Sequence, residues 1–362
     1  MTIAKVALAV LFHFMDLYLT SGISNNSQPT IVLPIENVLE TFYYTTIGLG
    51  SPSRGYKVLL DTGSADLWIS QERYHPLPTS AKNLHVNAET FYGLGSARGN
   101  LYTDVVTAGK FATQQAFLRA SSFSNRMPAM VDGMLGLAFL PNSWVNHALP
   151  SRLKANRSFI EKIAGEHRIS PCFGIFLGSA AVSGELVIGD CQGNPARYVG
   201  GTAALAWYAV GGTKRDWWHV PITGLSVDGT VVSRRGTRAL VDTGTALIAV
   251  DYETAEKANA AFGAYPTNIR GVWGVSCDAI TSSNTTVAII VGEKHFKLTG
   301  KDLRVQHQVD NPGVCYAPFM VSEWAEKNKV WILGAVFLRR YYTVYDYYGD
   351  GSNPRLGFAA TL

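Results

Sequence analysis

The sequence predicts an all-β protein with two structurally equivalent lobes, on three observations. The chain has 362 residues, which exceeds one ordinary domain and makes two lobes the expectation. Short β-branched and aromatic segments alternate with glycines, whereas helical periodicity is sparse. One order of motifs occurs once in each half of the chain, which indicates that the two halves fold alike.

The predicted elements follow this pattern along the chain. The clearest strands are Phe42–Ile47, Tyr56–Leu60, Gly184–Ile188 and Thr286–Val291, and the expected helices are Ser158–Gly165, Tyr252–Ala261 and Ala335–Arg340. The glycine-rich segment Tyr198–Gly212 is expected to join the lobes. We therefore divide the chain into an N-terminal segment at 23–37, an N-terminal lobe at 38–200 and a C-terminal lobe at 201–362.

The first 22 residues have the pattern of a secretory signal peptide. An apolar run, Val6–Leu19, follows Lys5 and precedes three small residues at 20–22. His13 and Asp16 interrupt the run, so a buried N-terminal helix is the alternative. No stretch of 18 uncharged apolar residues occurs, so no stable membrane anchor is expected. The expected location is outside the cell or in the lumen of a vacuole or lysosome.

The cysteine pattern favours disulfides over a metal site. Four cysteines contain no Cys-x-x-Cys pair, which argues against zinc. Three connectivities are possible, and the order along the chain favours Cys172–Cys191 and Cys277–Cys315. Each such bond would stabilise the fold by roughly 3–4 kcal/mol by constraining the unfolded chain. Glycosylation sequons lie at Asn25, Asn156 and Asn284.

Charge and motif searches exclude several other kinds of partner and cofactor. The net charge is +4 and no run of lysines or arginines occurs, so a nucleic-acid partner is not expected. The eight histidines lack metal-ligand spacing, and no Gly-x-Ser-x-Gly motif is present. The GLGSAR segment at 93–98 lacks the third glycine and the βαβ setting of a dinucleotide site. We expect neither a metal nor a cofactor.

The repeated motif contains an Asp-Thr-Gly triplet between apolar segments. Val58–Ser70 reads VLLDTGSADLWIS and Ala239–Val250 reads ALVDTGTALIAV. Two apolar residues and a glycine follow in each half, at Met134–Gly136 and Ile332–Gly334. One copy alone would be a glycine turn after a strand. From average residue usage the triplet occurs in under about a tenth of chains this long, so two flanked copies point to function.

Two aspartates brought together from equivalent loops would form an acid–base pair. At about 3 Å separation the carboxylates of Asp61 and Asp242 cannot both ionise easily, so they share one proton. The ionised group can then activate water as a base while its protonated partner donates to a carbonyl oxygen. Each motif also supplies a glycine for close backbone approach and a hydroxyl that can bond the carboxylate: Gly63, Ser64, Gly244 and Thr245.

The order of motifs resembles that of the pepsin-like aspartic endopeptidases, over residues 40–361. The motifs are DTGS with Trp68, FYGLGSARG at 91–99, VDGMLGLAF at 131–139, DTGT, VSCDAI at 275–280 and WILGAVFLRRYYTVYD at 331–346. The resemblance implies a bilobal fold of two β-barrel-like lobes with a central cleft. It also implies that the last strand, near Tyr341–Ala360, joins a sheet between the lobes.

The resemblance assigns roles to particular residues. It implies that Asp61 and Asp242 are catalytic, that Tyr92 and Gly93 form the tip of a β-hairpin flap, and that Trp68 bonds the Tyr92 hydroxyl. The expected walls of the main specificity pocket are Leu59, Val131 and Met134. Cys277 and Cys315 match the disulfide of the C-terminal lobe in this family.

The chain departs from pepsin in four respects. The segment from Asp61 to Tyr92 is shorter and lacks cysteines, and Cys172–Cys191 has no pepsin counterpart. Ala335 replaces an aspartate of pepsin, as in renin. Between residues 22 and 41 there is no lysine or arginine, so the basic inhibitory prosegment is missing from the sequence. Either the zymogen stage is dispensed with or the true start lies elsewhere.

These observations predict a monomeric aspartic endopeptidase that acts on protein or peptide substrates. The apolar pocket residues imply a preference for bulky apolar residues at the cleavage site. An optimum of roughly pH 4–6 is expected, because full protonation of the acids would leave 31 lysines and arginines and eight histidines repelling one another. The alternative is a catalytically silent pepsin-like binding or inhibitor protein. Such a protein should lack an Asp, a loop glycine or the flap Tyr, and all are present.

Overall fold

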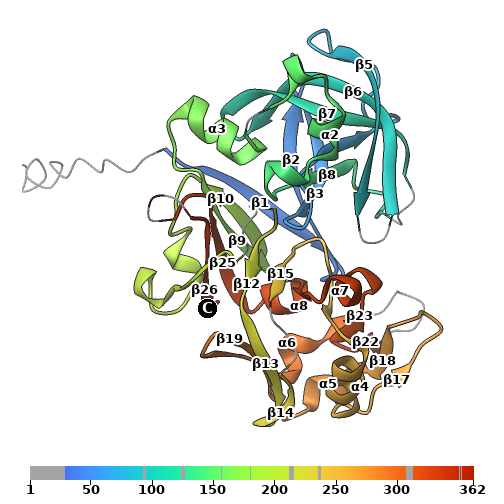
Figure 1. The fold of residues 1–362 in the computed structure, drawn as a ribbon, viewed down its shortest axis with the longest axis vertical. Coiled ribbons are helices and arrows are strands. Elements are labelled where there is room, and N and C mark those ends of the chain that lie inside the picture. The colour runs from blue at the N-terminus through green and yellow to red at the C-terminus, as the bar shows by residue number, and fades with distance from the viewer. Residues whose placement is uncertain are drawn as a thin grey trace, which may run out of the picture.

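The computed structural model describes residues 29–92, 95–123, 127–155, 157–179, 181–211, 216–234, 238–306, 313–349, 351 and 353–362. The predicted signal peptide, Gly93, Asn25 and Asn156 therefore lie outside the described residues. Strands predominate and the helices are few and short, which confirms the predicted all-β class (Figure 1).

The upper part of Figure 1 is a barrel-like sheet made by the first half of the chain. Its strands are β2 (Phe42–Leu49), β3 (Arg54–Asp61), β4 (Leu67–Ser70), β5 (Lys82–Tyr92), β6 (Gly95–Ala108), β7 (Phe111–Phe123) and β8 (Gly133–Gly136). They run in the order β2-β3-β8-β4-β7-β6-β5, and an extra pairing of β2 with β6 closes the sheet on itself. Alternating burial along β6 reflects this curvature, since one face of each strand lines the interior.

A second group of strands lies between the two halves and continues the same sheet. It comprises β1 (Ile31–Val38), β9 (Cys172–Gly178), β10 (Ser183–Ile188), β11 (Ala206–Ala209), β25 (Tyr341–Asp346) and β26 (Arg355–Ala360), in the order β11-β26-β25-β9-β10-β1. The predicted final strand Tyr341–Ala360 does join this sheet, but as a hairpin of two strands. Gly349, at φ +57°, lies in the turn that divides them.

The second half of the chain forms three smaller sheets and most of the helices. The strands are β12 (His219–Val220), β13 (Ile222–Val227), β14 (Thr230–Ser233), β15 (Ala239–Val241), β16 (Ile248–Val250), β17 (Tyr265–Pro266), β18 (Trp273–Ser276), β19 (Val287–Val291), β20 (Lys294–Leu298), β21 (Val305–Gln306), β22 (Val314–Tyr316), β23 (Phe319–Val321) and β24 (Trp331–Leu333). The sheets run β12-β15-β24-β16-β23, β14-β13-β19-β20 and β17-β18-β22-β21.

The repeated sequence motif corresponds to repeated topology. In the first half, β3 pairs parallel with β8, β8 antiparallel with β4, and β4 parallel with β7. In the second half, β15 pairs parallel with β24, β24 antiparallel with β16, and β16 parallel with β23. The two apolar-apolar-glycine segments therefore form the central strands β8 and β24. This equivalence confirms the two-lobed fold that the repeat predicts.

All three predicted helices are present. They are α3 (Phe159–His167), α4 (Tyr252–Ala260) and α8 (Ala335–Leu338). Helix α3 begins directly after its N-cap Ser158, because the Ser158 and Glu161 side chains each accept a hydrogen bond from the other's backbone amide. The sequence reasoning missed the short helices α2 (Trp144–Ala148), α5 (Cys277–Ser282), α6 (Gly300–Leu303) and α7 (Glu323–Asn328), and the 3₁₀ turns η1 (Leu140–Asn142), η2 (Ser151–Leu153), η3 (Pro195–Arg197) and η4 (Thr202–Ala204).

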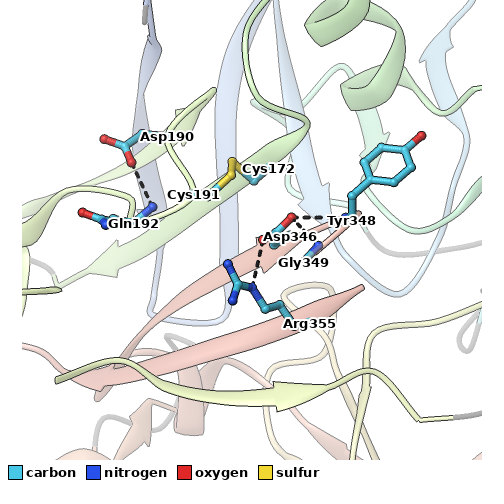
Figure 2. The surroundings of a disulfide bond; sticks show 8 residues. All are labelled: Cys172, Asp190, Cys191, Gln192, Asp346, Tyr348, Gly349 and Arg355. Carbon is cyan, nitrogen blue, oxygen red and sulfur yellow. Dashed lines mark hydrogen bonds and ion pairs between the residues drawn. A yellow bond between two sulfur atoms is a disulfide. The ribbon is translucent and has the colours of Figure 1, made fainter. Parts of the chain in front are cut away.

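Both predicted disulfides are present, Cys172–Cys191 and Cys277–Cys315. Figure 2 shows the first, which ties the start of β9 to the loop after β10. On the neighbouring strand β25, the Asp346 carboxylate accepts hydrogen bonds from the amides of Tyr348 and Gly349 and from Arg355 (Figure 2). The disulfide thus fixes the start of β9 and the carboxylate the end of β25, which are paired strands of the central sheet.

Candidate active site

The two motif aspartates occupy equivalent places at the ends of strands. Asp61 is the last residue of β3, and Asp242 directly follows β15. Their side chains are almost fully buried, at 5% and 7% exposed. Because β3 and β15 are the equivalent strands of the two lobes, each lobe contributes one carboxylate.

The hydrogen bonds to the two carboxylates are the same in both motifs. The amide of Gly63 donates to Asp61 Oδ1 at 2.9 Å, and the Ser64 hydroxyl donates to Oδ2 at 2.5 Å. In the second lobe, the amide of Gly244 and the hydroxyl of Thr245 donate to Asp242 at 2.8 and 2.6 Å. In each carboxylate the glycine amide therefore binds Oδ1 and the hydroxyl binds Oδ2.

The two carboxylates face each other across the boundary between the lobes. A Cβ at Gly63 would lie 2.8 Å from Cγ of Asp242, and a Cβ at Gly244 would lie 2.5 Å from Oδ1 of Asp61. Only glycine fits these positions, because any side chain would collide with the opposite carboxylate. Burial raises the pKa of Asp61 well above its ordinary value, and the negative charge of Asp242 raises it further.

The raised pKa of Asp61 predicts a pH-dependent loss of stability. The folded state holds the proton more tightly than the unfolded chain does. Its contribution to stability is therefore complete below the ordinary value of 3.8 and is lost as pH rises through the folded pKa. Relative to Asp61→Asn, the wild-type chain should lose thermal stability as pH rises from about 4 toward neutrality. Thermal unfolding across this range tests it, with the exposed Asp278→Asn as a control whose curve should run parallel to wild type.

Two threonines that sequence reasoning did not single out join the aspartate loops. Thr62 Oγ1 accepts from the amide of Thr243 at 3.0 Å and donates to the carbonyl of Val241 at 2.8 Å. Thr243 Oγ1 accepts from the amide of Thr62 at 3.1 Å and donates to the carbonyl of Leu60 at 2.8 Å. The signal for this pair was available, since each threonine is the middle residue of its Asp-Thr-Gly triplet.

Two tryptophans of the second lobe also bind the first lobe, and no sequence pattern predicted them. Trp217 Nε1 donates to the carbonyl of Gly63 at 3.2 Å, next to the Asp61 side chain. Trp218, fully buried, donates from Nε1 to the carbonyl of Leu137 at 3.0 Å. The position of the Asp61 loop therefore depends on contacts from both lobes.

The predicted flap is the hairpin of β5 and β6, in which Tyr92 pairs with Gly95. The rings of Tyr92 and Trp68 are stacked, 6.5 Å apart with an interplanar angle of 7°. The predicted hydrogen bond from Trp68 to the Tyr92 hydroxyl is absent: Trp68 Nε1 and the Tyr92 hydroxyl are both buried without a partner among the described residues. Burial, and then the charge of Asp61, raises the pKa of Tyr92.

The three predicted pocket residues lie in one buried cluster beneath the flap. Leu59, Val131 and Met134 belong to a hydrophobic cluster that also contains Trp68, and Tyr92 packs against it. Met134 Sδ lies 3.8 Å from the Ser64 hydroxyl, which places the cluster beside the Asp61 carboxylate. An apolar surface thus adjoins the pair of acids.

Other features of the site are apolar or uncharged. Ala335 is fully buried, and its amide donates to the carbonyl of Thr245 at 2.8 Å, so no charge stands at this position near Asp242.

Across the described ranges, no group of three or more His, Cys, Asp or Glu residues could hold a metal ion. Within those same ranges, no helix is long and apolar enough to cross a membrane.

Two lobes of equivalent topology, each giving one buried carboxylate to a shared site, define an aspartic protease. A family model for eukaryotic aspartyl proteases matches residues 42–361. Cathepsin D of Gallus gallus is 30% identical over 93% of this chain and 85% of its own length. Cathepsin E of Aquarana catesbeiana is 30% identical over 94% and 84%, and renin of Rattus norvegicus 28% over 94% and 83%.

The solved structures agree on the fold. An aspartic proteinase from Irpex lacteus superposes with a TM-score of 0.76 at 23% identity, covering 92% of this chain and 98% of that one. The chain belongs to the eukaryotic aspartyl protease family. It is a pepsin-like aspartic endopeptidase, as its sequence motifs predict.

Proposed function

We propose that Asp61 and Asp242 are the catalytic pair and that they hydrolyse peptide bonds flanked by bulky apolar residues at moderately acidic pH. The observation that carries this is the mutual approach of the two carboxylates, each held by a glycine amide and a hydroxyl. The ionised member takes a proton from the attacking water, and the protonated member donates to the carbonyl oxygen of the substrate. These roles belong to the pair, because the two titrations are coupled.

The pocket supports an apolar substrate preference. Leu59, Val131 and Met134 present side chains without charge beside the acids, so a bulky apolar residue would be desolvated there at no cost in lost hydrogen bonds. A polypeptide of about six to eight residues binds in extended form beneath the flap hairpin. Hydrogen bonds to the backbone of the peptide provide the affinity, and the pocket selects which side chain is bound.

The acidic working range follows from the shared proton. The raised pKa of Asp61 lets the pair keep one proton at a pH where an isolated aspartate would be ionised. Activity should fall at high pH as this proton is lost, and at low pH as the second carboxylate is protonated. We place the optimum at roughly pH 4–6, since self-repulsion of a basic chain opposes more acidic conditions.

We also propose that the protein enters the secretory pathway, acts as a monomer and is divided at 38–200 and 201–362. The two disulfides favour an oxidising compartment, such as the cell exterior or a lysosomal or vacuolar lumen. Asn284 is exposed in the loop after α5, which makes this sequon accessible to glycosylation.

A peptide-library cleavage profile combined with a pH–activity profile tests the proposed function. We expect cleavage next to Phe, Leu and other bulky apolar residues, with a maximum at roughly pH 4–6. Stoichiometric titration with a statine-containing peptide should count the active sites. A profile centred on charged residues, or durable maximal activity near pH 2, would refute the finer proposal. A folded protein that cleaves no unfolded substrate at any acidic pH would indicate a binding protein.

A further inference from the structure

Another buried aspartate, Asp66, lies just beyond the Asp61 loop and takes no part in the proposed acid–base chemistry. Asp66 is 3% exposed and precedes strand β4. Its carboxylate accepts four hydrogen bonds, so the cost of burying it is offset by donors from two separate elements. Those elements are helix α2 and the flap strand β5.

On one side, Asp66 holds the beginning of helix α2. The Ser143 hydroxyl donates to Oδ1 at 2.5 Å, and the amides of Trp144 and Val145 donate at 2.9 and 3.2 Å. The first amides of a helix have no partner within it, and a negative charge at this end is favourable. Asp66 thereby fixes the start of helix α2 to the segment between the Asp61 loop and β4.

On the other side, Asp66 holds the flap. The Thr90 hydroxyl donates to Oδ2 at 3.1 Å from strand β5, two residues before Tyr92. Successive strand residues point to opposite faces, so Thr90 and Tyr92 share the inner face. The intervening Phe91 is 50% exposed, and its ring packs against that of Trp144 on α2, with the ring centroids 5.1 Å apart. Three consecutive flap residues thus contact Asp66, α2 and Trp68 in turn.

We propose that Asp66 is a positioning residue that anchors the base of the flap through Thr90. The Asp66–Thr90 hydrogen bond fixes β5 relative to α2 and the Asp61 loop. This inference rests on the proposed role of the flap over Asp61 and Asp242. It assigns to Asp66 no contact with the substrate.

Substitutions at Thr90 distinguish a loss of flap anchoring from a general loss of thermal stability. Thr90→Val keeps the shape of the side chain and removes the hydroxyl, whereas Thr90→Ser keeps the hydroxyl. Thr113→Val is the matched control, because Thr113 is also buried in this lobe and its hydroxyl has no partner among the described residues. Ser143→Ala removes a donor to Asp66 from the opposite side and supplies a second route if Thr90→Val does not fold.

The measurements are kcat and KM on an internally quenched octapeptide with phenylalanine at the cleavage site, Ki for a statine-containing inhibitor, and thermal midpoints. Active sites are counted by titration. Loss of one hydrogen bond to a buried carboxylate should raise KM and Ki roughly tenfold in Thr90→Val. Thr90→Ser should stay within about threefold of wild type, Ser143→Ala should shift in the same direction as Thr90→Val, and Thr113→Val should match wild type.

Two outcomes would overturn the proposal that Asp66 anchors the flap through Thr90. In the first, Thr90→Val and Ser143→Ala lower only the thermal midpoint, with KM and Ki per active site equal to those of Thr113→Val. In the second, Thr90→Ser is as impaired as Thr90→Val, which would assign the effect to packing. In both outcomes the wild-type protein still cleaves the peptide. If the proposed function itself were wrong, neither the wild type nor any variant would cleave it.

Discussion

Replacing either Asp61 or Asp242 by asparagine should lower kcat by at least about 10³-fold, because general acid–base catalysis is then lost from one side of the pair. Asparagine has nearly the same shape, and its side-chain oxygen can still accept from the glycine amide that holds each carboxylate. The fold should therefore persist. Activity on the quenched octapeptide and thermal unfolding of each purified variant provide the measurement.

The matched control for this experiment is Asp278→Asn, an exposed aspartate in α5 far along the chain from both motifs. It should retain wild-type kcat. Both active-site variants should also keep much of the affinity for an extended peptide, because the flap and pocket remain. Retention of more than a small fraction of activity in either active-site variant would contradict the assignment of Asp61 and Asp242 as a pair.

The sequence predicted the parts of the site that depend on local chemistry. A glycine two residues after each Asp is required because the opposite carboxylate occupies the space of a side chain, and this requirement is visible as a repeated triplet. The apolar-apolar-glycine segments were also predictable, since they form the central strands β8 and β24 in equivalent sheets. Features that recur in both halves could thus be recognised before the fold was known.

Features that depend on distant contacts could not be predicted in the same way. Trp217 and Trp218 bind carbonyls of the other lobe, 154 and 81 residues away, and their neighbours carry no repeated pattern. The position of the Trp68 indole relative to Tyr92 depends on how the flap packs, so the expected hydrogen bond was wrong. The four missed helices are six residues or shorter, which is too short for a helical period to show.

The second large effect is expected at the threonines that join the two aspartate loops. Thr62 is fully buried, and Thr62→Val would leave the amide of Thr243 and the carbonyl of Val241 without their hydrogen bonds. Each buried backbone group left unpaired costs about 1–3 kcal/mol, so the free energy of unfolding should fall by about 2–6 kcal/mol. Urea unfolding followed by tryptophan fluorescence measures it, and kcat should fall as well because the carboxylates lose their alignment.

Thr243→Val completes a double-mutant cycle with Thr62→Val. The hydroxyls bond to backbone and not to each other, so a rigid interface would give additive losses. We expect a double variant that loses less than the sum of the single variants. Once one threonine is replaced, the aspartate loops of the two lobes can separate, so the remaining hydroxyl contributes less to the free energy of unfolding. Thr113→Val, which removes a buried hydroxyl without a partner, is the control and should change the unfolding free energy by under about 1 kcal/mol. If Thr62→Val unfolds at the same urea concentration as this control, the threonine pair does not join the lobes.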